Sequence, residues 1–152
     1  MFIENELKRL TGNVRVYLDM DGTIVHYDVN NPDNYDIKRP LIDRINKIKY
    51  LINNYDNITF YILSIGNKDV HVNQKNKWLD MYLPLIPKEN RVILIRNIGS
   101  QLSSATIKKN YINNLNTDDT IVLIDDDPRV LGALAKDNSN NAILYKDSIL
   151  SD

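Results

Sequence analysis

Short hydrophobic runs alternate with segments of helical periodicity, and this alternation is the feature that most constrains the fold. The runs are VRVYL, ITFYIL, RVILI and TIVLI at residues 14–18, 58–63, 91–95 and 120–124, with a shorter candidate, AILY, at 142–145. Between them, hydrophobic residues recur at helical spacing in residues 40–55, 70–82, 104–115 and 128–135. Strands that alternate with helices predict a parallel sheet covered on both faces.

The length of the chain fits one domain. We therefore expect residues 1–152 to form a single α/β domain, a doubly wound parallel sheet of about five strands. The longest irregular stretch is residues 26–40, which is long enough for a flap over one edge of the sheet but not for a second domain. The fold should have no sizeable cap domain.

Composition excludes several classes of protein. The net charge of -1 argues against strong general binding to nucleic acid or to an anionic membrane surface. The absence of cysteine excludes disulfides, thiolate metal sites and a cysteine nucleophile. There is no hydrophobic run of the roughly 20 residues that a membrane-spanning helix needs, and the first residues lack the core of a signal peptide. We expect a cytoplasmic protein.

Polar side chains follow several of the expected strands. In an open parallel sheet, ligands bind at the edge formed by the carboxyl ends of the strands. The residues placed there are Asp19, Asp21, Ser64, Asp125 and Asp126, with Lys108 and Lys109 in the helical segment before the fourth strand. Carboxylates gathered so closely repel one another unless a cation joins them. Mg²⁺ suits such a set of oxygen ligands, because it shares its coordination shell with water and phosphate. Asp127 is expected to cap the helix that begins at Pro128.

The order of these motifs resembles the haloacid dehalogenase superfamily of phosphohydrolases. The matching pieces are DMDGT after the first strand, Ser64 at the end of the second, a lysine at 108 or 109, and IVLIDDD at the fourth strand. Together they span residues 14–127, which is most of the chain.

The resemblance implies a role for each acid. Asp19 would attack phosphorus and form an aspartyl-phosphate, and Asp21 would act as general acid and then as general base. Mg²⁺ would be held by the Asp19 carboxylate, the Asp21 backbone carbonyl and one acid of the following pair. Asp126 is expected as the direct ligand, with Asp125 supporting it.

The same resemblance implies a phosphate-binding group. Ser64 and a lysine would bind the phosphoryl oxygens, where stabilisation of charge is usually the largest catalytic contribution. Lys108 is preferred as the catalytic lysine, and Lys109 stays a candidate for substrate binding. Gly22 would let the backbone turn closely beneath the phosphate, and Thr23 completes the set of substrate-binding residues.

The middle of the chain narrows the expected substrate. The segments KNKWLDMYLP and RVILIRN resemble the 5′(3′)-deoxyribonucleotidase group, which implies a nucleoside monophosphate as substrate. Tyr27 or Tyr35 would then stack on the base. The alternative is a phosphatase of a macromolecule, either a polynucleotide end or a phosphoprotein, because residues 26–40 are too short to close the site.

A receiver domain of a signalling system is a remote alternative without enzymatic activity. Receiver domains also gather acids, a hydroxyl and a lysine at the strand ends of a parallel sheet. Their phosphorylated aspartate ends the third strand, whereas here the third strand runs into RVILIRN, which contains no acid.

Overall fold

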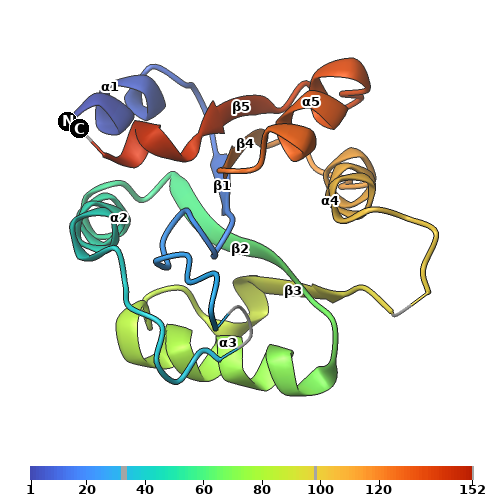
Figure 1. The fold of residues 1–152 in the computed structure, drawn as a ribbon. Helices are drawn as coiled ribbons and strands as arrows, with labels where there is room; N and C mark the ends of the chain where they lie inside the picture. Colours follow the sequence, from blue (N-terminus) through green and yellow to red (C-terminus); the bar gives the residue numbers. More distant parts are fainter. Residues whose placement is uncertain (32–33, 98, 152) are drawn as a thin grey trace.

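A computed structural model describes residues 1–31, 34–97 and 99–151. Five parallel strands form one sheet in the order β3-β2-β1-β4-β5, which confirms the predicted α/β fold class (Figure 1). The strands are β1 (Val14–Leu18), β2 (Ile58–Gly66), β3 (Arg91–Ile95), β4 (Thr120–Asp125) and β5 (Ile143–Lys146). The chain runs from β1 outward to β3 and then returns to the other side of β1. The direction of winding therefore reverses between β1 and β4.

Helices cover the two faces of the sheet. Figure 1 shows α1, α2 and α3 on one side of the sheet and α4 and α5 on the other. The helices are α1 (Phe2–Lys8), α2 (Ile42–Asn54), α3 (Asp69–Tyr82), α4 (Ser104–Asn113) and α5 (Pro128–Lys136), with short 3₁₀ helices η1 (Lys88–Asn90) and η2 (Asp147–Leu150). The four helices expected between strands are all present. The sequence patterns did not reveal α1, which is short and packs Ile3 and Leu7 into the core.

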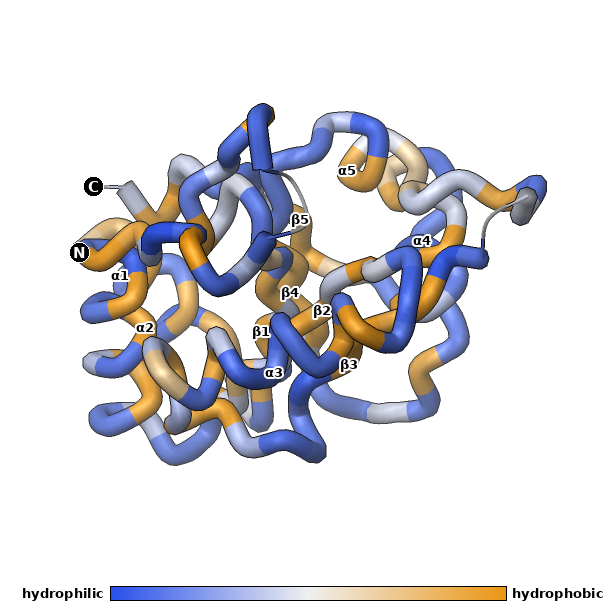
Figure 2. The backbone as a smooth tube through the Cα atoms, turned by 60° about the horizontal axis from the view of Figure 1, so that its bottom comes forward, coloured by the Kyte–Doolittle hydropathy of each residue, from blue (hydrophilic) through white to orange (hydrophobic). Residues whose placement is uncertain are grey.

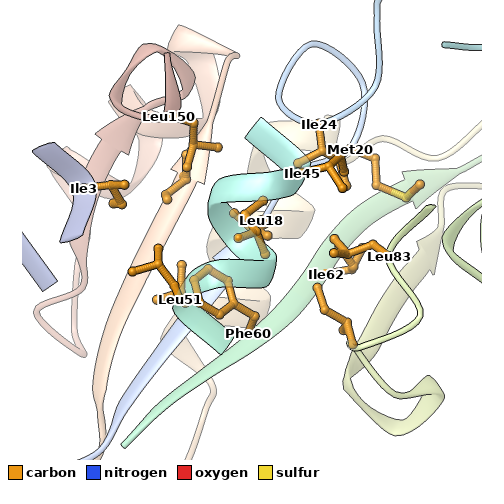
Figure 3. Close-up of a cluster of buried hydrophobic side chains, with 14 of the residues drawn as sticks. Ile3, Leu18, Met20, Ile24, Ile45, Leu51, Phe60, Ile62, Leu83 and Leu150 are labelled. Atoms are coloured by element: carbon orange, nitrogen blue, oxygen red, sulfur yellow. The ribbon is translucent and has the colours of Figure 1, made fainter. Parts of the chain in front are cut away.

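Alternation along the central strands divides the core into two layers. In β1, Val16 and Leu18 join the cluster under α1, α2 and α3, while Tyr17 joins the cluster under α4 and α5. Successive side chains of a strand point to opposite faces of the sheet, so a strand that is hydrophobic along its whole length contributes side chains to both layers. Figure 2 shows the strands as hydrophobic segments inside a more hydrophilic outer chain, and Figure 3 shows Leu18 and Ile62 within the first layer.

Two helices begin at residues whose side chains cap the first turn. Ser103 caps α4, since its side chain accepts a hydrogen bond from the backbone N–H of Thr106. Asp127 caps α5 in the same way through the backbone N–H of Arg129 and stands directly before Pro128. Each cap satisfies a backbone donor that the first turn of a helix leaves free. These caps fix where α4 and α5 begin, beside the carboxyl ends of β1 and β4.

The stretch after β1 forms a small flap. Isolated bridges join Asp21 to Val25 and Val25 to Pro40, and they close the stretch on itself. Residues 32 and 33, which belong to the predicted flap, lie outside the described residues. As predicted, the part of the chain that the structure describes contains no large cap. Among residues 1–31, 34–97 and 99–151, no helix combines the length and hydrophobicity that crossing a bilayer requires.

Candidate active site

Asp19 and Asp125 lie beside each other because β1 and β4 are neighbours in the sheet. Leu18 pairs with Ile124 in the parallel register, and the Asp19 N–H donates to the Ile124 carbonyl over 3.0 Å. Both side chains are buried, Asp19 at 8% exposure and Asp125 at 0%. This position is where the winding of the sheet reverses, the usual binding site in open α/β sheets.

Lys108 joins the two carboxylates. It projects from α4, and its Nζ lies 2.7 Å from Asp19 Oδ1 and 2.7 Å from Asp125 Oδ2. Burial by itself would lower the pKa of Lys108, but the charges of Asp19 and Asp125 outweigh burial and raise it. Lys108 therefore stays cationic in the site.

Lys109 faces elsewhere. Its Nζ lies 3.6 Å from an Asp137 carboxylate oxygen, and Lys109 does not line the cavity that contains Asp19. On a helix, adjacent residues point about 100° apart, so two neighbouring lysines cannot both face one site. The structure brings Lys108 to the site and does not bring Lys109 there.

Asp126 completes a cluster of acids. Asp19, Asp125 and Asp126 each offer a carboxylate oxygen, and these three oxygens lie within 4.8 Å of one another. Burial, followed by the hydrogen bond and negative charge of Asp19, raises the pKa of Asp126 to about 8. Burial and Asp19 also raise the pKa of Asp125, against the opposing effect of Lys108. The site thus favours a positive charge among these acids, and their hard oxygen donors fit Mg²⁺.

Gly22 makes room for Asp126. Its φ of +81° lies in the left-handed region, and a Cβ at this position would lie 2.1 Å from Asp126 Oδ2. Thr23 is fully buried, and its Oγ1 lies 3.4 Å from Asp19 Oδ2. Neither residue lines the cavity. The structure therefore places Gly22 against Asp126 and Thr23 beside Asp19, outside the residues that line the cavity.

The flap holds the Asp21 side chain. Lys38 Nζ lies 2.7 Å from Asp21 Oδ1, and the Tyr35 hydroxyl donates to Asp21 Oδ2. Lys38 and Tyr35 are both buried. The expectation that Tyr35 is free to stack on a base is therefore wrong, because its ring is enclosed in the flap and its hydroxyl is bonded to Asp21. Tyr27 remains 55% exposed at the cavity.

Ser64 has a lysine behind it. Ser64 is buried near the end of β2, and Lys75 Nζ of α3 lies 2.6 Å from its Oγ and 2.6 Å from the Ile65 carbonyl oxygen. Burial lowers the pKa of Lys75 to about 8, against the opposing charges of Asp21 and Asp19.

A cavity of about 620 Å³ opens over these groups. Its lining includes Asp19, Asp21, Ser64, Lys108, Asp125 and Asp126, together with the rim residues Tyr27, Asn67, Ser104 and Arg129. The structure thus brings together at one opening the carboxylate cluster, the Lys108 ammonium group, the Ser64 hydroxyl and the separate carboxylate of Asp21.

Two buried lysines beside the site, Lys38 and Lys75, are absent from the sequence expectations. Lys75 lies three and four residues before Trp78 and Leu79, so helical spacing places it on the buried face of α3. A lysine at a core position of a helix is the signal that could have found it, since lysine is almost never fully buried without a partner. Lys38 lies in irregular chain and carries no such periodic signal.

Comparisons with known proteins support the fold. No protein-family model matches the sequence, and no curated protein is recognisably similar to it. A chain in a structure of the Pnkp1/Rnl/Hen1 complex is 17% identical with a TM-score of 0.66, and the match covers 90% of this chain and 46% of that one. A chain in a structure of the Pnkp1/Rnl/Hen1 RNA repair complex is 16% identical with a TM-score of 0.65, and the match covers 88% of this chain and 42% of that one.

The HAD domain of the effector protein Lem4 from Legionella pneumophila is 14% identical with a TM-score of 0.49, covering 90% of this chain and 86% of that one. This chain spans less than half of the length of the matched chains from the RNA repair complexes. At these identities, the likeness to the repair-complex chains is one of fold.

Proposed function

We propose that this protein is a Mg²⁺-dependent phosphomonoester hydrolase in which Asp19 is the nucleophile. The observation that carries the proposal is the setting of the Asp19 carboxylate. One of its oxygens is bonded to Lys108 over 2.7 Å, and the same carboxylate belongs to the cluster with Asp125 and Asp126. A carboxylate held this way at an open cavity is suited to attack an anionic phosphoryl group, because the nearby cation offsets the repulsion.

The reaction has two steps. An Asp19 carboxylate oxygen bonds to phosphorus while the bond from phosphorus to the leaving oxygen breaks, and Asp21 gives that oxygen its proton. A water molecule then attacks the aspartyl-phosphate, Asp21 takes the proton of the water, and Asp19 is released together with inorganic phosphate. Dividing the hydrolysis into two transfers lowers the barrier of each.

The remaining polar groups bind the phosphoryl oxygens. Lys108 has three N–H donors, and two of them reach Asp19 and Asp125, which leaves one for the substrate. Ser64 lines the same cavity and supplies a hydroxyl. Asp19, Asp126 and the Asp21 backbone carbonyl would hold Mg²⁺, with Asp125 in support. The chemistry that Mg²⁺ supplies here is neutralisation of the acids and of the incoming phosphoryl charge.

A nucleoside monophosphate is the first substrate proposed. The support is the sequence resemblance to 5′(3′)-deoxyribonucleotidases and the exposed Tyr27 ring at the cavity, on which a base can stack. A phosphorylated polynucleotide end is the second candidate. The absence of a large cap favours it, as does the fold shared with a chain of an RNA repair complex.

A panel of phosphomonoesters tests the proposal. The wild type and Asp19→Asn are assayed with Mg²⁺ on an aryl phosphate, nucleoside monophosphates and oligonucleotides phosphorylated at either end. The wild type should release phosphate, and Asp19→Asn should not. Equal rates for the two proteins would contradict the assignment of the nucleophile. A preference for oligonucleotide ends would select the second substrate.

A further inference from the structure

The hydrogen bonds of Lys75 are unusual for a lysine on a core face. Lys75 is only 3% exposed and shares the inner side of α3 with Trp78 and Leu79. Its two hydrogen-bond acceptors, among the residues that the structure describes, are neutral oxygens of Ser64 and Ile65. A buried cation without a bonded carboxylate is costly, so a position of this kind calls for an explanation beyond packing.

The direction of the hydrogen bond to Ser64 follows from the chemistry of the two groups. An ammonium group only donates, whereas a hydroxyl has one proton to donate and two lone pairs that accept. Over the 2.6 Å between Lys75 Nζ and Ser64 Oγ, the hydroxyl must therefore be the acceptor. The single proton of Ser64 is left for another acceptor.

The cavity is where such an acceptor would bind. Ser64 lines the same opening as Asp19 and Lys108, whereas Lys75 does not line it. Lys75 instead borders a smaller, neighbouring hollow that Asp21 and Tyr35 also line. Its Nζ also lies 5.5 Å from the centre of the Tyr35 ring. Lys75 thus supports Ser64 from behind and does not reach the reacting atoms.

We propose that Lys75 is a positioning residue, which fixes the Ser64 hydroxyl as a hydrogen-bond donor to a phosphoryl oxygen in the cavity. This inference rests on the proposed function, because it needs a phosphoryl group at Asp19. The Ser64 proton points into the cavity before substrate arrives, so no reorientation is needed on binding. The positive charge behind the hydroxyl also makes it a stronger donor, as expected for linked hydrogen bonds in a poorly solvated site.

A double-mutant cycle separates this role from packing. The variants are Lys75→Met, Ser64→Ala and the two combined, all assayed with Mg²⁺ on an aryl phosphate. Methionine is apolar and has nearly the length of lysine, so it fills the same space. Lys77→Met is the matched control, because Lys77 is exposed on the same helix and its substitution also removes one positive charge.

Lys75→Met is expected to lower kcat/KM about 10-fold, as for the loss of a hydrogen bond to a charged group. In the Ser64→Ala background it should change kcat/KM less than about 2-fold, since coupled residues do not act additively. Both single variants should divide their effect between kcat and KM in the same way. Lys77→Met should match the wild type. An equal loss from Lys75→Met with and without Ser64 would overturn the proposal.

A binding measurement distinguishes failure of this inference from failure of the proposed function. Inorganic phosphate is titrated calorimetrically into each variant with Mg²⁺ present. If the wild type has no turnover but Lys75→Met and Ser64→Ala weaken phosphate binding by the same factor, the proposed function fails and the role of Lys75 stands. If phosphate binds equally well to the wild type and to Lys75→Met, or does not bind the wild type at all, the role of Lys75 is refuted.

Folding is checked by circular dichroism and thermal unfolding. If Lys75→Met loses the folded structure, Lys75→Leu takes its place in the cycle, because leucine is shorter and packs readily beside Trp78 and Leu79. If both apolar variants fail to fold, Lys75 is a structural residue and the proposal is refuted.

Discussion

Replacing Gly22 by alanine should damage the proposed Mg²⁺ site more than it damages the fold. A Cβ at Gly22 would lie 2.1 Å from Asp126 Oδ2 and 2.7 Å from Asp126 Cγ, whereas ordinary contacts begin at 3.4 Å. The Asp126 carboxylate would have to move by more than ~1 Å, and disturbing the groups that orient a metal ligand typically weakens metal affinity about 10–100-fold. We therefore expect Gly22→Ala to bind Mg²⁺ at least about 10-fold more weakly than the wild type.

Gly12→Ala is the matched control for this prediction. Gly12 has a φ of +73°, close to the +81° of Gly22, but a Cβ there meets nothing within 4 Å. A left-handed alanine costs about 1–2 kcal/mol, which corresponds to a fall in Tm of about 2–8 °C for a chain of this size. Gly12→Ala should show this loss of stability and keep the Mg²⁺ affinity of the wild type.

Calorimetric Mg²⁺ titration and thermal unfolding of both variants provide the assay. Gly22→Ala should lose at least as much Tm as Gly12→Ala and should alone lose Mg²⁺ affinity. Equal Mg²⁺ affinity in the two variants would refute the reasoning, because it would mean that the Asp126 carboxylate is not a metal ligand or that it does not need the space beside Gly22.

Three further predictions follow from the geometry of the site. Lys108→Met leaves the buried Asp19 and Asp125 without their common partner, so urea unfolding should show a loss of about 3–5 kcal/mol; an unchanged midpoint would contradict the importance of this pair. Folding raises the pKa of Asp126 from 3.8 to about 8, so the folded protein binds the Asp126 proton more tightly than the unfolded chain does. Without metal, the free energy of unfolding should therefore fall as pH rises between these two values. Mg²⁺ replaces the proton, so the gain in Tm from Mg²⁺ should be larger near pH 8 than near pH 5.5, and an equal gain at both would contradict the assignment. Tyr27→Ala should raise KM for nucleoside monophosphates by about 5-fold or more through lost stacking, and leave KM for a small alkyl phosphate unchanged; parallel increases in steady-state assays would exclude base stacking.

The sequence predicts the sheet and the central acids for the same physical reason. Hydrophobic strands buried on both faces are easily recognised, and the residue after each strand then falls at one edge of the sheet. Asp19 and Asp125 therefore come together from the register of β1 and β4 alone. Which of Lys108 and Lys109 faces the acids depends on how α4 is rotated about its axis, and the structure turns Lys108 toward them.

What the sequence does not predict depends on tertiary contacts of irregular chain. The flap has no hydrophobic period, so nothing in its sequence indicates that Tyr35 packs onto Asp21 or that Lys38 becomes buried against the same carboxylate. Thr23 is the last residue of the DMDGT motif, but the motif does not reveal that its side chain is fully buried beside Asp19. Lys75 is the intermediate case, because its place on the inner face of α3 can be derived but its bond to Ser64 cannot.

The central claim is that a phosphoryl group is transferred to the Asp19 carboxylate, and trapping this intermediate tests it most directly. Asp21→Asn is mixed with an activated aryl phosphate and Mg²⁺, quenched, and treated with borohydride, which reduces an acyl phosphate to the alcohol. Asp21→Asn lacks the general base of the second step, so the intermediate should accumulate. Mass spectrometry of the peptide that contains residue 19 should then find the reduced side chain at that position and not in Asp19→Asn. Turnover by the wild type with no modification at Asp19, or with modification at another acid, would contradict the account.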